Sequence, residues 1–125
     1  MNVITKEWIS KAEGDFNSAQ RELRARKNPN YDASCFHAQQ CIKKYLKARL
    51  IEAEISFPKT HDLAYLVGLL TPAEPLFATL ENQFRMLNDY AVEFRYPGET
   101  ANKETATLLF LYCIWLLYVK EIAYF

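Results

Sequence analysis

Residues 32–53 read DASCFHAQQCIKKYLKARLIEA and carry two helical patterns at once. Apolar residues recur at steps of three and four and form one buried stripe, which consists of Ala38, Cys41, Ile42, Tyr45 and Leu46. Polar residues with the same spacing form a second row, which consists of His37, Gln40, Lys44 and Lys47. These patterns predict a two-faced helix whose N-cap is Asp32. The polar row is either a solvated surface or one wall of a binding groove.

Apolar spacing of the same kind continues on both sides of this stretch. A preceding helix is predicted from a Thr5 cap to about Arg26, and a last helix from an Asn102 cap nearly to Phe125. Between them, Thr60 is expected to start a short helix with Asp62 in its first turn. Residues 71–74 have the form of a capping box, which predicts a longer helix that ends at residues 97–98.

The length and composition fit a single helical domain. The chain has 125 residues, 50% of them hydrophobic, and only three glycines, which favours helices joined by short loops. The predicted fold is all-α: an up-and-down bundle of four long helices plus one short helix, with residues 1–125 forming one domain. Fifteen basic and fifteen acidic residues cancel, so any anion site must be local.

The cysteines and the N-terminus point to a reducing cytoplasm. Three cysteines cannot all pair within one chain, and they are expected to be small buried residues. No Cys/His cluster has metal-ligand spacing and no glycine-rich phosphate loop occurs, so neither a metal nor a cofactor is expected. The first residues contain no apolar signal core, which predicts a cytoplasmic protein.

The last predicted helix is apolar on all sides. Its run LLFLYCIWLLYV, residues 108–119, rises only about 18 Å as a helix and is too short to cross a bilayer core. A buried helix is therefore predicted, with no membrane span. Because such a helix needs partners on more than one side, a homodimer is expected.

Three segments carry a family resemblance. FHAQQCIKKYLKA, then FPKTHDLAYL, then EFRYPG together resemble the HEPN family, the nucleotide-binding domains of higher eukaryotes and prokaryotes. The chain is most similar to the small prokaryotic members encoded beside a minimal nucleotidyltransferase. The resemblance implies a helical bundle, a nucleotidyltransferase partner, a toxin–antitoxin-like role and an association with nucleotides.

The same resemblance suggests a groove. Related chains carry an RYP-like signature near the groove of their helices, which here corresponds to Arg95, Tyr96 and Pro97. An arginine there suits bidentate binding of phosphate. Together with the polar row, the resemblance predicts a ligand or partner groove made of His37, Gln40, Lys44, Arg95, Tyr96 and Pro97.

A secondary anion site is predicted at the start of the short helix. Lys59, Thr60 and His61 stand together there, where exposed backbone N–H groups favour an anion. The competing interpretation is that Thr60 and Asp62 only cap the helix.

Ribonuclease activity is the main alternative. Ribonucleases of the family share an arginine followed, after four to six residues, by a histidine, and neither His37 nor His61 has that spacing. Counted from Arg95, the histidine position falls on residues 100–102, none of which is a general base near neutral pH. The preferred function is thus a nucleotide-associated interaction module, and the missing histidine argues against an enzyme without excluding one. The alternatives are a metal-independent ribonuclease that uses His37 or His61, which leaves RNA open as a ligand, and a bundle that only dimerises.

Overall fold

The structure is a computed structural model that describes the backbone of residues 2–93 and 98–123 and the side chains of residues 2–89 and 98–117. In this part of the chain the order is α1 (Val3–Arg24), α2 (Tyr31–Glu52), α3 (Leu63–Leu70), the 3-10 helix η1 (Pro75–Leu80), α4 (Glu81–Glu93) and α5 (Lys103–Ala123). The predicted all-α bundle with one short helix is confirmed.

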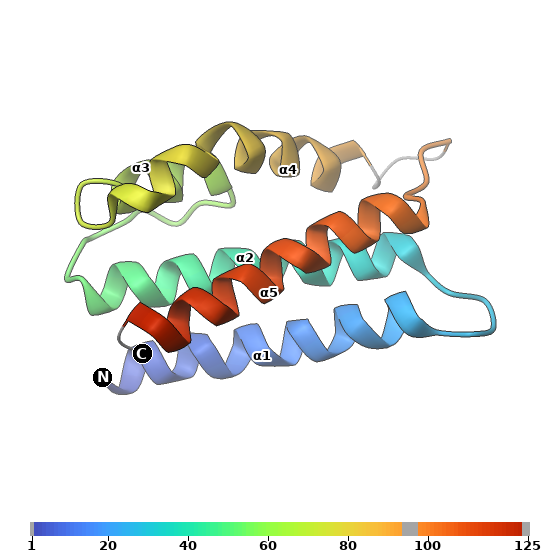
Figure 1. The fold of residues 1–125 in the computed structure, drawn as a ribbon, viewed down its shortest axis with the longest axis horizontal. Helices are drawn as coiled ribbons and strands as arrows, with labels where there is room; N and C mark the ends of the chain where they lie inside the picture. The colour runs from blue at the N-terminus through green and yellow to red at the C-terminus, as the bar shows by residue number, and fades with distance from the viewer. Residues whose placement is uncertain (1, 94–97, 124–125) are drawn as a thin grey trace.

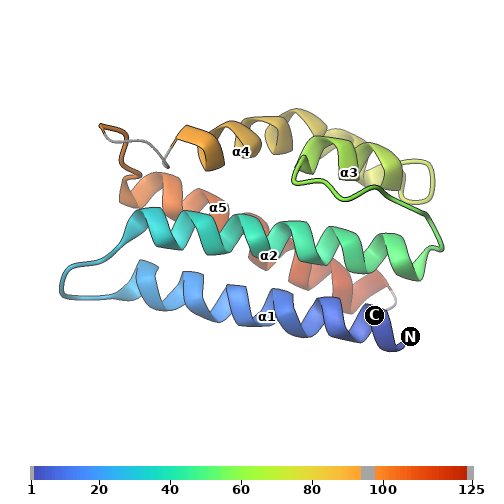
Figure 2. The ribbon, with the colours of Figure 1, turned by 180° about the vertical axis from the view of Figure 1, so that it is seen from behind.

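The helices form an up-and-down arrangement. In Figure 1, α1 and α4 run in one direction and α2 and α5 in the other. Both α1 and α5 pack against α2, while α3 and α4 pack on each other and cover α2 from the opposite side. The view from behind in Figure 2 shows the same layers, with α2 in the middle of the molecule. The central place of α2 explains why its polar row is only partly open to solvent.

Asparagine and aspartate side chains begin the helices, but not always at the predicted residue. Asn2 caps α1 by accepting from the backbone N–H of Thr5 at 2.7 Å, so the predicted Thr5 cap is wrong and the Thr5 side chain is buried. Asn30 caps α2 through the N–H of residue 33, so the predicted Asp32 cap is also wrong. The Asp32 carboxylate instead accepts from the Ala101 N–H at 2.7 Å and ties the loop before α5 to α2.

The predictions for the middle of the chain need two corrections. Asp62, and not Thr60, caps α3 by accepting from the Tyr65 N–H at 3.1 Å. The capping box predicted at residues 71–74 does not form, because η1 lies between it and α4. Glu74 turns its carboxylate to Arg49 of α2 instead. At the other end, the predicted Asn102 cap of α5 is confirmed by a 2.8 Å bond from the Thr105 N–H.

Aromatic pairs join α5 to the rest of the core. Phe110 stacks on Phe16 of α1 with ring centroids 4.8 Å apart. Tyr112 meets the edge of Phe84 of α4 at 5.6 Å, and a third edge-to-face pair joins α5 to η1. These contacts fix α5 against three neighbouring elements, since offset and edge-to-face arrangements are the favoured geometries of aromatic rings.

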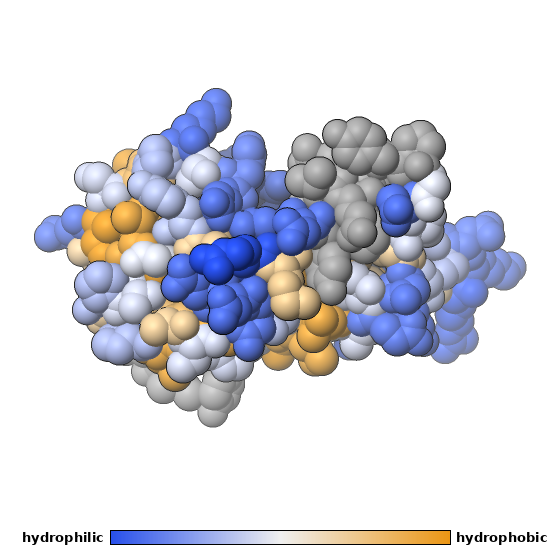
Figure 3. All heavy atoms as spheres, turned by 90° about the horizontal axis from the view of Figure 1, so that it is seen from above, coloured by the Kyte–Doolittle hydropathy of each residue, from blue (hydrophilic) through white to orange (hydrophobic). Residues whose placement is uncertain are grey.

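The face formed by α3 and α4 is largely polar. Seen from the side of α3 and α4 (Figure 3), the described part of this face is mostly hydrophilic, and its hydrophobic side chains gather in a few separate patches. Among the described residues, none of the helices is long and apolar enough to cross a membrane.

Candidate functional site

The polar row of α2 lies along α1 and is only partly open to solvent. Lys47 is only 6% exposed and the neighbouring Lys43 and Gln39 are also buried, so the row is not a fully solvated surface. The cause is the antiparallel packing of α1 along α2, which covers this side of the helix. His37, Gln40 and Lys44 are partly buried at the edge of this contact.

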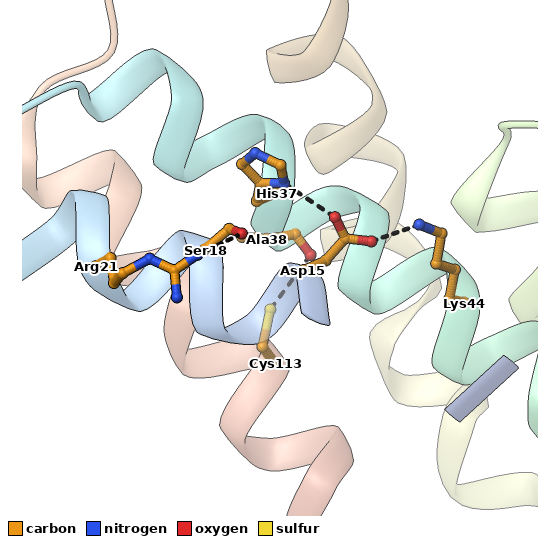
Figure 4. A network of polar contacts seen from close by, with 7 residues as sticks. All are labelled: Asp15, Ser18, Arg21, His37, Ala38, Lys44 and Cys113. Atoms are coloured by element: carbon orange, nitrogen blue, oxygen red, sulfur yellow. Dashed lines mark hydrogen bonds and ion pairs between the residues drawn. The ribbon is translucent and has the colours of Figure 1, made fainter. Parts of the chain in front are cut away.

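Asp15 of α1 joins two members of the predicted groove (Figure 4). Its Oδ1 accepts from His37 Nδ1 at 2.9 Å and its Oδ2 accepts from Lys44 Nζ at 2.5 Å. One carboxylate therefore fixes an imidazole and an ammonium that stand two helical turns apart. Gln40 lies between them on α2, and no hydrogen bond of its side chain is recorded in the described part of the chain.

Farther along the row, the ammonium of Lys47 lies between two aromatic rings. It is 5.2 Å from the ring centroid of Trp8 in α1 and 5.7 Å from that of Phe57 in the loop after α2. An ammonium near a ring is attracted by the negative face of the ring. Burial lowers the pKa of Lys47, and the nearby charges of Lys59 and Lys44 lower it further.

The predicted secondary site lies beside this lysine. His61 is exposed and its Nδ1 accepts from Lys43 Nζ at 2.9 Å, while Lys59 is exposed. Thr60 Oγ1 accepts from the backbone N–H of Asp62 at 3.1 Å, which closes a turn just before α3, so of the two predicted capping residues only Asp62 caps the helix. Because α3 begins only at residue 63, His61 is not in its first turn, and the predicted helix-end anion site is wrong in that respect.

The structure thus places one described residue of each predicted site near Lys47. Lys44 belongs to the groove set and Lys59 to the secondary set, and both act on the charge of Lys47. Lys43, which is adjacent to Lys44 in α2, contacts His61 of the loop. We call Lys44, Lys47 and Lys59 the lysine cluster.

The RYP-like segment lies outside the described residues. Arg95, Tyr96 and Pro97 therefore remain sequence predictions. Of the residues at the family's histidine position, Ala101 is buried and bonded to Asp32, and Asn102 caps α5. Both have structural roles in this chain.

The cysteines do not form a nucleophilic site. All three are free and buried, as predicted. Burial raises the pKa of the Cys35 thiol to about 12, and the nearby Asp32 carboxylate adds to this effect. Burial also raises the pKa of Cys113, whose Sγ donates to the carbonyl oxygen of Ala38 at 3.2 Å. Within residues 2–89 and 98–117, no group of three or more His, Cys, Asp or Glu side chains is placed to hold a metal ion.

Three residues of this region were not predicted from the sequence: Asp15, Trp8 and Phe57. Trp8 lies in the apolar stripe of α1, whose spacing gives no sign of a contact with a lysine. Asp15 offers one sequence signal, because it follows Ala12 by three residues and so borders that stripe. An acidic residue at the edge of a buried face often pairs with a cation of the neighbouring helix.

The architecture and the site define an all-α bundle with a cationic region between α1, α2 and the following loop. The family model of the HEPN domain matches residues 5–117, so this chain belongs to the HEPN domain family. Membership supports a nucleotide-related or ribonuclease-like module. No curated protein and no solved structure matches the chain.

Proposed function

We propose that this HEPN domain is a non-catalytic, nucleotide-associated interaction module that works with a minimal nucleotidyltransferase in a toxin–antitoxin-like pair. One observation carries the proposal. Ribonucleases of the family would have a histidine at one of positions 100–102, and in this chain residues 101 and 102 have structural roles instead. A buried alanine and a helix cap cannot transfer a proton. The proposed setting is the cytoplasm, with which three free thiols agree.

A metal-independent ribonuclease is the second candidate, and the Asp15–His37 contact favours it. A carboxylate bonded to one ring nitrogen of a histidine orients the imidazole and stabilises its charged form, which is how a general base is commonly positioned. The same contact is also explained as an interhelical ion pair. In the other histidine, Nδ1 is already occupied by Lys43.

The first prediction separates these functions. We expect the gene beside this one to encode a small nucleotidyltransferase, and the two proteins to co-elute after co-expression. Arg95→Ala should weaken the complex by about 1.5–3 kcal/mol, the scale of a hydrogen bond to a charged group, whereas Arg85→Ala on the exposed side of α4 should not.

A transcript-cleavage assay completes this experiment. The wild-type protein should leave the transcript intact, as should His37→Ala and His61→Ala. Cleavage by the wild type that His37→Ala abolishes would replace the proposal with the ribonuclease. Failure to co-elute with any neighbouring nucleotidyltransferase would remove the proposed partner.

We also propose that the protein is a homodimer that buries part of α5. Leu108, Leu111 and Ile114 are exposed along this helix, and the first two line a shallow hollow with Leu80 and Trp115. Apolar side chains gathered in this way favour a contact with another apolar surface.

The second prediction tests this dimer. By light scattering at micromolar concentration, the wild type should have twice the chain mass of 14.6 kDa, and Leu111→Glu should return it to the monomer because a buried charge opposes association. Met86→Glu is the matched control, since Met86 on α4 and Leu111 are both 54% exposed. A monomeric wild type, or a dimer that Leu111→Glu leaves intact, would contradict the proposed interface.

A further inference from the structure

Lys47 is a largely buried residue, and its ammonium has no anionic partner among the described side chains. Its residue is 6% exposed, and in the described part of the chain its ammonium has no hydrogen bond and no ion pair. Its recorded contacts are the rings of Trp8 and Phe57. Placing an ammonium in such a position is unfavourable unless another group compensates its charge, and two rings do so only in part.

The neighbouring charges make this position less favourable still. Lys44 and Lys59 both act on Lys47 as like charges. Asp15 of α1, the carboxylate that faces the row, already uses one oxygen for His37 and the other for Lys44. Phe57 contacts Lys47 and His61 contacts Lys43, so the loop between Phe57 and His61 lies along α2 and carries Lys59 on the same side as Lys44 and Lys47. Asp15 offsets only part of the charge of these lysines.

We propose that the lysine cluster of Lys44, Lys47 and Lys59 binds a phosphate group between α1, α2 and the loop that follows α2. A phosphate carries about −1.5 to −2 charges at neutral pH and offers three acceptor oxygens, which suits several converging ammonium groups. The rings of Trp8 and Phe57 exclude water from one side of Lys47, and an ion contact is stronger where water is excluded.

The two rigid helices position this site in advance. Lys44 and Lys47 are one turn apart on α2, and Lys44 is held by Asp15, so little side-chain freedom is lost when an anion binds. Lys59 is exposed and contributes from the loop. The proposed ligand is a free phosphate or the phosphate of a nucleoside monophosphate. This inference does not depend on the nucleotidyltransferase partner.

The third prediction is the test of this site. Calorimetric titration of the full chain with inorganic phosphate and with adenosine monophosphate should show binding of at least one of them, whereas adenosine and chloride at matched ionic strength should show none. Lys47→Met should weaken binding by about tenfold or more, as expected when a charged hydrogen-bond donor is lost. Lys103→Met, on the exposed start of α5, should stay within about twofold of wild type.

Thermal melts distinguish a ligand site from a structural lysine. Lys47→Met keeps the length and apolar body of the side chain, so the melting temperature of the variant in chloride should equal or exceed that of wild type. The rise in melting temperature that phosphate causes in the wild type should be absent in the variant. The exposed Lys59→Met serves as a second variant and should also bind more weakly. The inference is overturned if wild type binds neither phosphate compound at millimolar concentration, if adenosine binds equally well, or if both lysine variants bind as wild type does.

Discussion

Replacing Phe84 by alanine should lower the free energy of unfolding by about 3–5 kcal/mol. Phe84 of α4 is fully buried, and its ring meets the edge of Tyr112 at 5.6 Å. Truncation removes the apolar surface that the ring buries and leaves a cavity that helices fixed on both sides cannot close. The aromatic contact to α5 is lost as well.

Phe36→Ala is the control for this fourth prediction. Phe36 is the same residue type on α2, but it is 47% exposed. Its truncation should lower the free energy of unfolding much less, by about 1 kcal/mol or below, because nearly half of the side chain already contacts water. Urea unfolding of both variants measures the difference. Equal losses at the two positions would mean that α4 does not pack on α5 as described.

The helices could be predicted from the sequence because each depends on a local pattern. Steps of three and four residues give the buried stripe of α1 and of α2 without knowledge of their partners. Caps were less predictable, since several residues near a helix start can accept the first N–H groups. Asn30 and Asp32 could both cap α2. The Asp32 carboxylate instead accepts from the N–H of Ala101, which is 69 residues away in the sequence, so Asn30 is left as the cap.

The lysines of the candidate site could be predicted from the sequence, but their contacts with α1 could not. The sequence places Lys44 and Lys47 in one row, but it cannot show that α1 covers the row. Asp15 stands 29 residues before Lys44, and no pattern within either helix pairs them. The same holds for Trp8 and Lys47. Contacts between distant segments therefore decide that the polar row is partly covered by α1, which the pattern of α2 alone leaves open.

The fifth prediction concerns Glu74, whose carboxylate holds Arg49 of α2. Arg49 is 2% exposed, its Nε donates to Glu74 Oε2 at 2.8 Å, and its Nη2 donates to the other carboxylate oxygen. The guanidinium also lies over the ring of Phe77 at 5.6 Å. Glu74→Gln keeps the shape of the side chain but removes its charge, so we expect a loss of about 3–5 kcal/mol in the free energy of unfolding.

The reason for this large loss is desolvation. A guanidinium that is nearly inaccessible to water depends on its bidentate carboxylate, whereas an exposed pair is solvated with or without its partner. Glu81→Gln removes an exposed pair with Arg85 at 3.2 Å and should change stability by no more than about 0.5 kcal/mol. The double variant Arg49→Met with Glu74→Leu should recover most of the loss, because it removes both buried charges together. Chemical unfolding of the four proteins completes the comparison. If Glu74→Gln lowers the free energy of unfolding no more than Glu81→Gln does, the Arg49–Glu74 pair does not hold the turn before η1 against α2. The packing of Phe77 alone must then do so.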